Sequence, residues 1–349
     1  MKKYLYSFIG IIVILALIAI IFKNPLSQTI GKFSSKLFPQ PAQVQLTKII
    51  VTYHYASAAK PEMAVAIKNK LFEKYGLSIE INEVTSGQAM AQALISGKTD
   101  VVLAGQATFL KAAAAGAKIK SVGLINSSTR WYFVSRKEPQ NIKTYCAIGI
   151  TTEDYLRGAS ALKNLGIDIN SLNITNLPSD NLCINALISG KVDSMTVAEP
   201  IWENLKMQNK DLSVFKIITK AYGGNYIVLP VAILVMNNTL SNKNQAIENF
   251  SKALIEANYW LKVHSEAEIE KEISGVAKID PSMGKIYSKI IKGQLEGIKF
   301  TQKLSEVEAI RKTYENITPQ LKDYNVKNFL STQISDDLKK QGFLQKYGF

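Results

Sequence analysis

The chain has 349 residues, of which 47% are hydrophobic and 20% are charged. This balance excludes an intrinsically disordered protein and leaves room for two lobes of ordinary domain size. The formal net charge is +14, but the lysines are spread along the chain and form no arginine-rich or aromatic-interleaved cluster, so we expect no nucleic-acid partner.

The first predicted element is an apolar helix near the N-terminus. Lys2 and Lys3 precede an uncharged run over residues 4–22. At 1.5 Å per residue this run approaches the ~30 Å thickness of a bilayer's hydrocarbon core. The basic residues before it favour a cytoplasmic N-terminus and an exported remainder. Residues 1–23 are therefore predicted to be a transmembrane anchor, with a cleaved signal peptide as the alternative.

A polar segment over residues 24–47 follows the apolar run and contains Pro25, Pro39 and Pro41. Prolines among polar residues are typical of extended linkers. We expect this segment to hold the folded part of the chain away from the membrane.

From Lys48 onward, predicted strands and helices alternate, a pattern that favours an α/β sheet with parallel strands. The first series contains strands over residues 48–53, 78–84, 100–104, 121–125 and 131–134, and helices over 61–75, 87–96 and 106–115. A second series contains strands over 144–150, 172–177 and 192–197, and helices over 153–165, 180–189 and 200–207.

The two series share one phrase. Ala93–Asp100 reads Ala-Leu-Ile-Ser-Gly-Lys-Thr-Asp and recurs as Ala186–Asp193 with Val in place of Thr. In both copies a helix ends at a glycine, Gly97 or Gly190, which suits the left-handed backbone that terminates helices. The repeat predicts two lobes of like topology.

The apolar run over residues 226–236 is predicted to return from the second lobe and add a strand to the first, with Pro230 disfavouring an ordinary central strand. Helices are predicted beyond it over 244–263, 266–273, 281–296, 306–316 and 326–341, with a separate last helix that begins at Ser335 as the alternative for the end of the chain. The predicted domains are residues 48–127 with 231–349 for the first lobe and 128–230 for the second.

The two cysteines, Cys146 and Cys183, fall in the second series. In an exported protein they either pair or remain two buried thiols. They and the two histidines, His54 and His264, lack the spacing of a metal site, so no metal or other cofactor is expected.

Several phrases together resemble one family, the sulfonate-, taurine-, nitrate- and thiamine-pyrimidine-binding proteins of ABC importers, also called NMT1/THI5-like or SsuA/TauA-like. The resemblance covers roughly Lys48 to Lys262. It is carried by Pro61 with the helix end Lys74-Tyr-Gly-Leu77, by Ala93–Asp100, by Leu165-Gly-Ile-Asp168, and by Ala198-Glu-Pro200 followed by Trp202.

The resemblance implies a type II periplasmic-binding-protein fold: two α/β lobes joined by two crossover segments, here with an N-terminal transmembrane helix and C-terminal helices. It also implies an extracytoplasmic solute-binding protein, not an enzyme, that captures a small sulfonate, taurine-like, nitrate-like or pyrimidine-like solute between the lobes. The implied partners are that ligand, an ABC permease and its ATPase subunits, and the membrane through the N-terminal helix.

The ligand site is expected where loops follow the carboxyl ends of parallel strands and meet helix N-termini, which suit anionic or polar groups. The candidate ligand-binding residues at these loops and near the crossovers are Tyr53, His54, Tyr55, Ser57, Ser86, Gln106, Ser127, Ser128, Thr129, Thr151, Thr152, Glu199 and Asn225. No catalytic residue is expected.

Two of the charged residues near these loops have alternative roles. Glu199 precedes Pro200 at a predicted helix start, where it either accepts a hydrogen bond from a ligand amine, hydroxyl or ring N–H, or caps the helix. Arg130 either contacts the ligand or pairs with a carboxylate.

An enzyme on the same fold, of the pyrimidine-precursor synthase or desulfinase type, is the alternative function. The chain contains no cysteine-rich cluster, and the loop His54–Ser57 contains no cysteine nucleophile. A nucleophilic Ser57 would need a base, for which His54 is the nearby candidate.

Overall fold

The computed structural model describes residues 45–150, 152–207, 216–218, 221, 227–293 and 299–349, with the side chains of 126–129, 216 and 227–229 outside the description. The strands are β1 (Thr47–His54), β2 (Leu77–Val84), β3 (Val101–Ala104), β4 (Ile119–Ser135), β5 (Thr144–Ala147), β6 (Asn173–Asn176), β7 (Ser194–Ala198), β8 (Lys216–Ile217) and β9 (Ile227–Met236).

The helices before β9 are α3 (Lys60–Lys68), α4 (Leu71–Lys74), α5 (Gly87–Ile95), α6 (Ala107–Ala114), α7 (Glu153–Asn164), α8 (Asp180–Ile188) and α9 (Glu199–Met207). After β9 come α10 (Asn237–Asn242), α11 (Asn244–Val263), α12 (Glu266–Ile273), α13 (Pro281–Lys292), α14 (Leu304–Tyr314), α15 (Gln333–Lys340) and α16 (Phe343–Lys346). Short 3-10 turns lie at Pro139–Asn141, Ile169–Ser171, Pro319–Leu321 and Val326–Asn328.

The described strands form one hydrogen-bonded sheet in the order β2-β1-β3-β9-β4-β7-β5-β6, with β8 beside β4. β1 pairs in parallel with β2 and β3, and β5 pairs in parallel with β6 and β7. β9 runs antiparallel to β3, and β4 runs antiparallel to β7. The two parallel sets thus have the same order, which confirms the like topology that the repeated phrase predicts.

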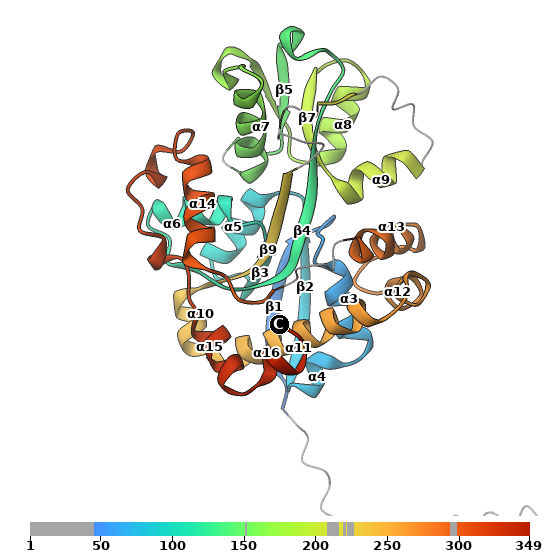
Figure 1. Cartoon of the computed structure of the whole chain (residues 1–349), viewed down its shortest axis with the longest axis vertical. Helices are drawn as coiled ribbons and strands as arrows, with labels where there is room; N and C mark the ends of the chain where they lie inside the picture. The colour runs from blue at the N-terminus through green and yellow to red at the C-terminus, as the bar shows by residue number, and fades with distance from the viewer. Residues whose placement is uncertain (1–44, 151, 208–215, 219–220, 222–226, 294–298) are drawn as a thin grey trace, which may run out of the picture. The chain divides into compact units, whose positions relative to one another are not determined.

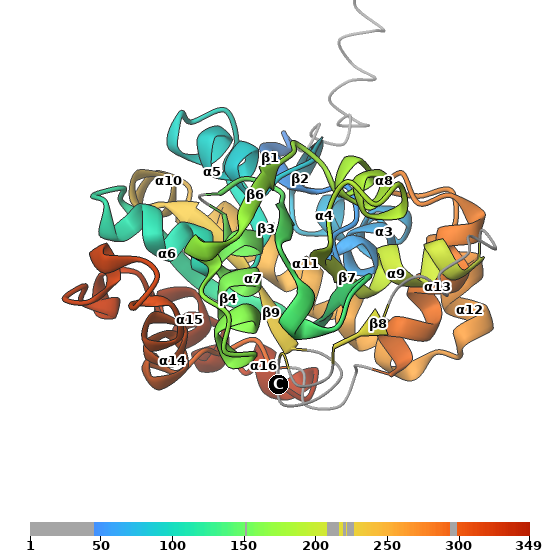
Figure 2. The same cartoon turned by 90° about the horizontal axis from the view of Figure 1, so that it is seen from above.

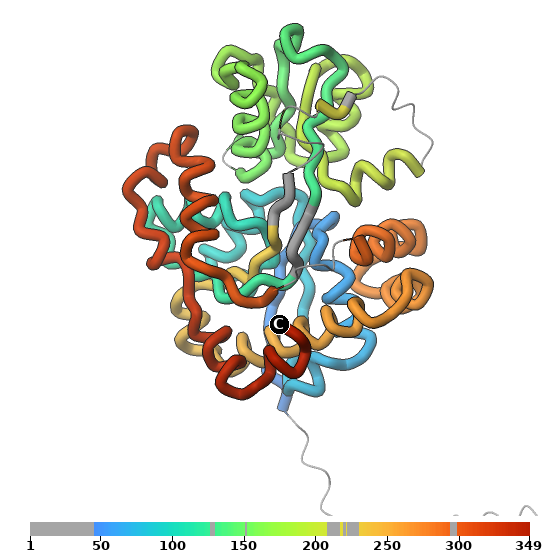
Figure 3. Tube along the Cα trace, viewed as in Figure 1, coloured from blue at the N-terminus to red at the C-terminus, as the bar shows by residue number. Residues whose placement is uncertain are grey.

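We call β1–β3 with α3–α6 and α10–α16 the first lobe, and β5–β8 with α7–α9 the second lobe (Figure 1). β4 and β9 pass side by side from one lobe to the other and pair with each other along the way (Figures 1 and 3). These strands are the two predicted crossovers. The residue limits predicted for the domains remain a prediction.

Helices cover both faces of the sheet (Figure 2). In β3, Val101 and Leu103 pack into a core with α3 and α11, whereas Val102 and Ala104 pack into a second core with α5 and α6. A strand that is buried on both faces has a continuous apolar sequence, as Val101-Val-Leu-Ala104 does.

The repeated phrase has the same structural role in each lobe. Gly97 and Gly190 both have left-handed backbones, with φ of 72° and 74°. The Asp100 carboxylate accepts a hydrogen bond from the Ile50 N–H (3.0 Å), and the Asp193 carboxylate accepts one from the Thr144 N–H (3.0 Å). Each acid therefore ties the start of a central strand to its parallel neighbour.

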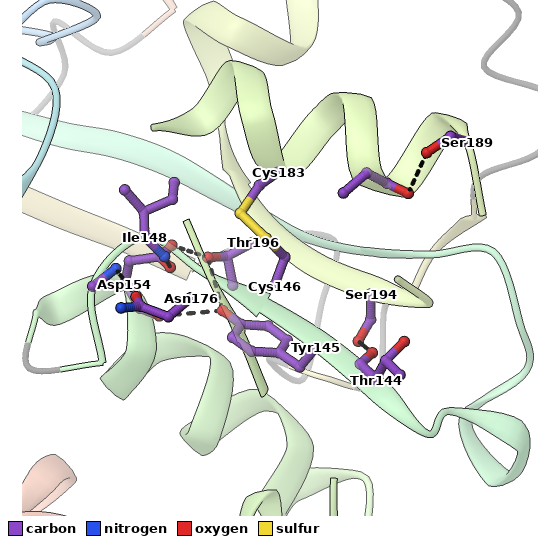
Figure 4. The surroundings of a disulfide bond; sticks show 12 residues. Thr144, Tyr145, Cys146, Ile148, Asp154, Asn176, Cys183, Ser189, Ser194 and Thr196 are labelled. Atoms are coloured by element: carbon purple, nitrogen blue, oxygen red, sulfur yellow. Dashed lines mark hydrogen bonds between the residues drawn. A yellow bond between two sulfur atoms is a disulfide. The ribbon is translucent and has the colours of Figure 1, made fainter. Parts of the chain in front are cut away.

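Cys146 in β5 and Cys183 in α8 form a disulfide, so of the two alternatives for the cysteines the structure shows pairing (Figure 4). Both residues are buried among the apolar side chains between α8 and the sheet. The bond fixes α8 to the strand whose end leads to α7.

The helix predicted over residues 61–75 is interrupted. α3 ends at Lys68, and Lys70 has a left-handed backbone with φ of 52°, after which α4 begins. After this break, Leu71 and Phe72 at the start of α4 are both buried in the first-lobe core.

The separate strands predicted over 121–125 and 131–134 are one long strand, β4. Its pairing with β9 continues through the polar residues between them, with register shifts at Ser121/Gly123, Leu124/Asn126 and Asn126/Thr129. Tertiary pairing therefore overrides the low strand propensity of this stretch.

The helix predicted over 326–341 is also wrong as a single element, because residues 329–331 pair with β4. Ser121 donates its N–H to the Phe329 carbonyl (2.8 Å), and Ser331 donates its N–H to the Ser121 carbonyl (2.9 Å). The last helices, α15 and α16, begin only after this pairing.

Among the described residues, no helix combines the length and the apolarity needed to cross a membrane. The anchor predicted at 1–23 and nearly all of the linker predicted at 24–47 lie outside those residues.

Candidate functional site

A cavity of about 110 Å³ lies between the two lobes, several times the ~10–15 Å³ that a single water requires. It is lined by the ends of β1 and β3, the first turns of α5 to α8, and the crossovers. The lining residues are His54, Ala56, Ser57, Ala58, Ser86, Gly87, Met90, Leu103, Ala104, Gly105, Thr108, Phe109, Trp131, Ile148, Thr152, Glu153, Asp154, Arg157, Asp180, Ala198, Pro230 and Val231.

This position follows from the topology. β1 and β3 in the first lobe, and β5 and β7 in the second, direct their carboxyl ends and the following loops toward the space between the lobes. Parallel pairing places helix N-termini at the same edge, so α5, α6, α7 and α8 all begin at the cavity.

Three charged side chains at the start of α7 dominate the second-lobe wall. Glu153, Asp154 and Arg157 are all at least nine-tenths buried. The Arg157 guanidinium lies 3.5 Å from an Asp154 oxygen and 3.9 Å from a Glu153 oxygen, and it stacks 3.4 Å from the centre of the Trp131 ring. One guanidinium thus serves two carboxylates and an aromatic face.

Burial raises the pKa of both carboxyls above their usual range, and the neighbouring Arg157 offsets this only in part. Desolvation penalises the charged form of an acid, and for these two carboxyls it outweighs the stabilisation by Arg157.

Asp154 is held by groups of its own lobe (Figure 4). Its carboxylate accepts hydrogen bonds from the Ile148 N–H (2.9 Å) and from the Thr196 hydroxyl. It therefore joins the ends of β5 and β7 to α7.

Glu153 instead reaches across to the first lobe. The Ala107 N–H, at the start of α6, donates a hydrogen bond to its carboxylate, and the Glu153 N–H donates to the Thr108 hydroxyl (2.6 Å). A Cβ at Gly105 would lie 2.2 Å from a Glu153 oxygen, so only glycine leaves room for the carboxylate at this point. The two lobes are thus in direct polar contact beside the cavity.

A second polar contact between the lobes involves His54 and Asp180. His54 Nε2 lies 3.1 Å from Asp180 Oδ2, while the Ala56 N–H donates to His54 Nδ1 (3.2 Å). Because Nδ1 accepts a hydrogen bond, the Nε2–H side of the ring faces the Asp180 carboxylate.

Tyr55 adds a third group to this contact, because its hydroxyl donates to Asp180 Oδ2 (3.4 Å). Burial, together with the Asp180 carboxylate, raises the pKa of the Tyr55 phenol well above its usual range, so the hydroxyl remains a donor.

Of the residues predicted from the sequence, His54, Ser57, Ser86 and Thr152 line the cavity. The Ser86 hydroxyl accepts from the Ala89 N–H and caps α5, and the Thr152 hydroxyl donates to the Ile148 and Gly149 carbonyls.

Four predicted residues lie elsewhere. Tyr53 is fully buried in the first-lobe core, and Tyr55 lies behind the lining against Asp180. Gln106 is buried against Gln302 and Ser121. Glu199 accepts hydrogen bonds from Arg130 (2.9 Å) and from Tyr132, away from the cavity lining.

The remaining predicted residues are not described as side chains. Thr151 and Asn225 lie outside the described residues, and Ser127, Ser128 and Thr129 are described only as backbone of β4.

Sequence reasoning missed the charged wall formed by Glu153, Asp154, Arg157 and Asp180. A signal was present: two adjacent acids at a predicted helix start, followed by an arginine three and four positions later on a helix that is otherwise rich in small residues. Within the described part of the chain, no three or more His, Cys, Asp or Glu side chains are grouped as metal ligands.

Comparisons with solved structures give extensive matches at low sequence identity. A protein of Bordetella bronchiseptica RB50 matches with a TM-score of 0.68 at 16% identity, over 85% of this chain and 98% of its own. The alkanesulfonate-binding protein SsuA of Xanthomonas axonopodis pv. citri, bound to MOPS, matches with 0.61 at 17% identity, over 79% and 94%. The periplasmic nitrate-binding protein NrtA of Synechocystis PCC 6803 matches with 0.64 at 11% identity, over 86% and 90%. These matches show the periplasmic-binding-protein fold.

Sequence comparison gives the family. Among curated proteins, none matches this chain. The sequence model described as NMT1/THI5 like matches residues 61–267, which is more than half of the chain. This range includes every described residue of the cavity wall except four at the end of β1 and in the loop after it. The chain belongs to the NMT1/THI5-like family.

Proposed function

We propose that this protein is the extracytoplasmic solute-binding component of an ABC importer and holds one small organic solute in the cavity between its lobes. The observation that carries this proposal is the cavity itself, which both lobes line at the carboxyl ends of their parallel strands. SsuA and NrtA, which share the fold, are named as sulfonate- and nitrate-binding proteins.

Movement of the lobes about β4 and β9 would open and close this cavity, and the closed form would be presented to a permease served by an ATPase. The polar contacts of Glu153 with α6 and of His54 with Asp180 support a closed arrangement, because each joins groups of opposite lobes.

We also propose that residues 1–23 anchor the protein to the membrane, with a cleaved signal peptide as the alternative. The Cys146–Cys183 disulfide supports an oxidising, extracytoplasmic location. It also weakens the desulfinase alternative, because neither cysteine is a free thiol.

Thermal unfolding of the full-length chain, purified with detergent present, tests the proposal. The panel comprises sulfonates, nitrate, bicarbonate, pyrimidines, flavins, amino-sulfonates and simple amines. A solute at 100 times its Kd should stabilise the native state by about 2.7 kcal/mol. We expect one chemical class to raise the Tm. An unchanged Tm across the panel contradicts a binding function, and conversion of a bound solute to a product favours an enzyme.

A further inference from the structure

We propose that the cavity selects a small organic solute that carries a protonated nitrogen, such as an aminium or amidinium group, and excludes simple anions. This inference rests on the proposed function and names the chemical class of its ligand. It departs from the sulfonate and nitrate named for the structural neighbours.

The described lining of the cavity carries more acidic than basic side chains. Three carboxylates, those of Glu153, Asp154 and Asp180, face the cavity with one guanidinium, that of Arg157. The cavity wall is therefore acidic, although the whole chain has a formal charge of +14.

Arg157, the one guanidinium of the described lining, already interacts with groups of the chain itself. Its guanidinium already faces both Asp154 and Glu153 and stacks on Trp131. An anionic solute that approached it would meet the two carboxylates at the same place, and like charges at contact distance disfavour binding.

Three of the four helix N-termini at the cavity, those of α6, α7 and α8, are occupied by acids, whereas that of α5 is capped by Ser86. Helix N-termini otherwise favour anions. The start of α6 already receives the Glu153 carboxylate through the Ala107 N–H. The first turn of α7 carries Glu153 and Asp154, and the first turn of α8 carries Asp180. The positive ends of these three helices are thus neutralised by the chain's own acids.

A cationic solute would add positive charge next to the buried carboxyls. Burial raises the pKa of Glu153 and Asp154 because Arg157 offsets their desolvation only in part. A protonated nitrogen donates charge-assisted hydrogen bonds to carboxylate oxygens and removes that deficit.

The apolar part of the lining favours a cation that also carries a hydrocarbon group. Met90, Leu103, Phe109 and Ile148 supply apolar surface opposite and beside the acids. Within the described residues the acids and histidines are not grouped as metal ligands, so a bare divalent ion fits this wall less well than an organic cation does.

The test uses the full-length chain with detergent present and three matched series of solutes: methyl, propyl and benzyl, each as amine, alcohol and sulfonate. Calorimetric titration should show that the best amine binds at least about tenfold tighter than its alcohol and its sulfonate, the gain of one charge-assisted hydrogen bond. Tighter binding of a sulfonate than of its amine overturns the charge assignment and leaves a solute-binding function standing. No binding by any member, together with a flat response to the broader panel above, contradicts the function as well.

Glu153→Gln is the matching variant, because it removes the charge and keeps the shape and the acceptor for the Ala107 N–H. It should weaken amine binding about tenfold to hundredfold and leave sulfonate binding unchanged or stronger. Glu203→Gln, the same chemical change on α9 outside the cavity lining, should leave both unchanged. Equal amine affinities for wild type and Glu153→Gln would contradict the role of the carboxylate. The solute series on the wild-type chain decides the proposal even where a variant folds poorly.

Discussion

Glu153 and Asp154 are neighbours in the chain, yet their carboxylates have different partners. Asp154 is bound within its own lobe by Ile148 and Thr196, whereas Glu153 contacts the first turn of α6 in the other lobe. Successive residues at the start of a helix point in different directions. One acid therefore stabilises a lobe, and the other makes a contact that opening of the lobes would break.

The raised pKa of Glu153 predicts how this residue affects stability. Where a buried acid has a raised pKa in the folded state, the folded protein becomes more stable as the pH falls through that pKa. Above that pKa the ionised acid destabilises the folded protein. We expect ligand-free Glu153→Gln to be more stable than wild type at pH 8, by on the order of 1 kcal/mol, with the difference vanishing toward pH 4.

Thermal unfolding of both proteins across this pH range is the measurement, with Glu203→Gln as the control. Asp154, Arg157 and Tyr314 also face Glu153, so the wild-type transition reports this group of residues together. A Glu153→Gln variant that is less stable at pH 8 than at pH 4, relative to wild type, would contradict the assigned burial cost.

At the scale of elements, α8 connects the core of the second lobe to the cavity. Its first turn carries Asp180, which faces His54 and Tyr55, and its next turn carries Cys183, which is bonded to Cys146 in β5. Cys146 is also paired with Met195 in the neighbouring strand β7. The disulfide therefore fixes the helix that presents Asp180 to the other lobe.

Removing this bond should destabilise the protein. The two cysteines are 37 residues apart, and the loop-entropy relation gives about 3–4 kcal/mol for a loop of this length. We expect Cys146→Ala/Cys183→Ala to unfold at lower denaturant concentration than wild type, measured by chemical denaturation followed by circular dichroism. Dithiothreitol should shift the wild type toward the variant and leave the variant unmoved. Equal midpoints for the oxidised wild type and the variant would show that the bond contributes little.

Elements with strong local signals could be predicted well from the sequence. The helix predicted over 266–273 matches α12, which begins with a capping box of Ser265 and Glu268, and the apolar run predicted over 226–236 matches β9 closely. The errors arise where pairing with residues far away in the sequence determines the local structure. Pairing with β9 keeps the polar middle of β4 extended, and hydrogen bonds with Ser121 hold residues 329–331 in a non-helical conformation. Neither partner is close in the sequence.

At the scale of the whole molecule, the repeated phrase predicts two lobes of like topology, and the strand order confirms it. The cavity lies at the edge of the sheet where the sequence predicts the ligand site, and four of the predicted residues line it. Loops after strands could be located from the sequence, as His54, Ser57, Ser86 and Thr152 show. The packing of the two lobes decides which side chains of a first helical turn face the cavity. The positions of Glu153 and Asp180 in the cavity wall could therefore not be predicted from the sequence.

The central claim, a single small solute held between the lobes, can be tested by mass spectrometry of small molecules released from the denatured full-length chain. Gly87 lines the cavity, and a Cβ there would meet Thr108 of the first lobe at 3.4 Å and Thr152 of the second at 3.6 Å. Gly87→Ala therefore fits as a control, whereas the larger side chain of Gly87→Leu occupies the space between the lobes. We predict one solute at about one molecule per chain from wild type and from Gly87→Ala, and its loss from Gly87→Leu. The same solute recovered equally from all three proteins would contradict a site in this cavity.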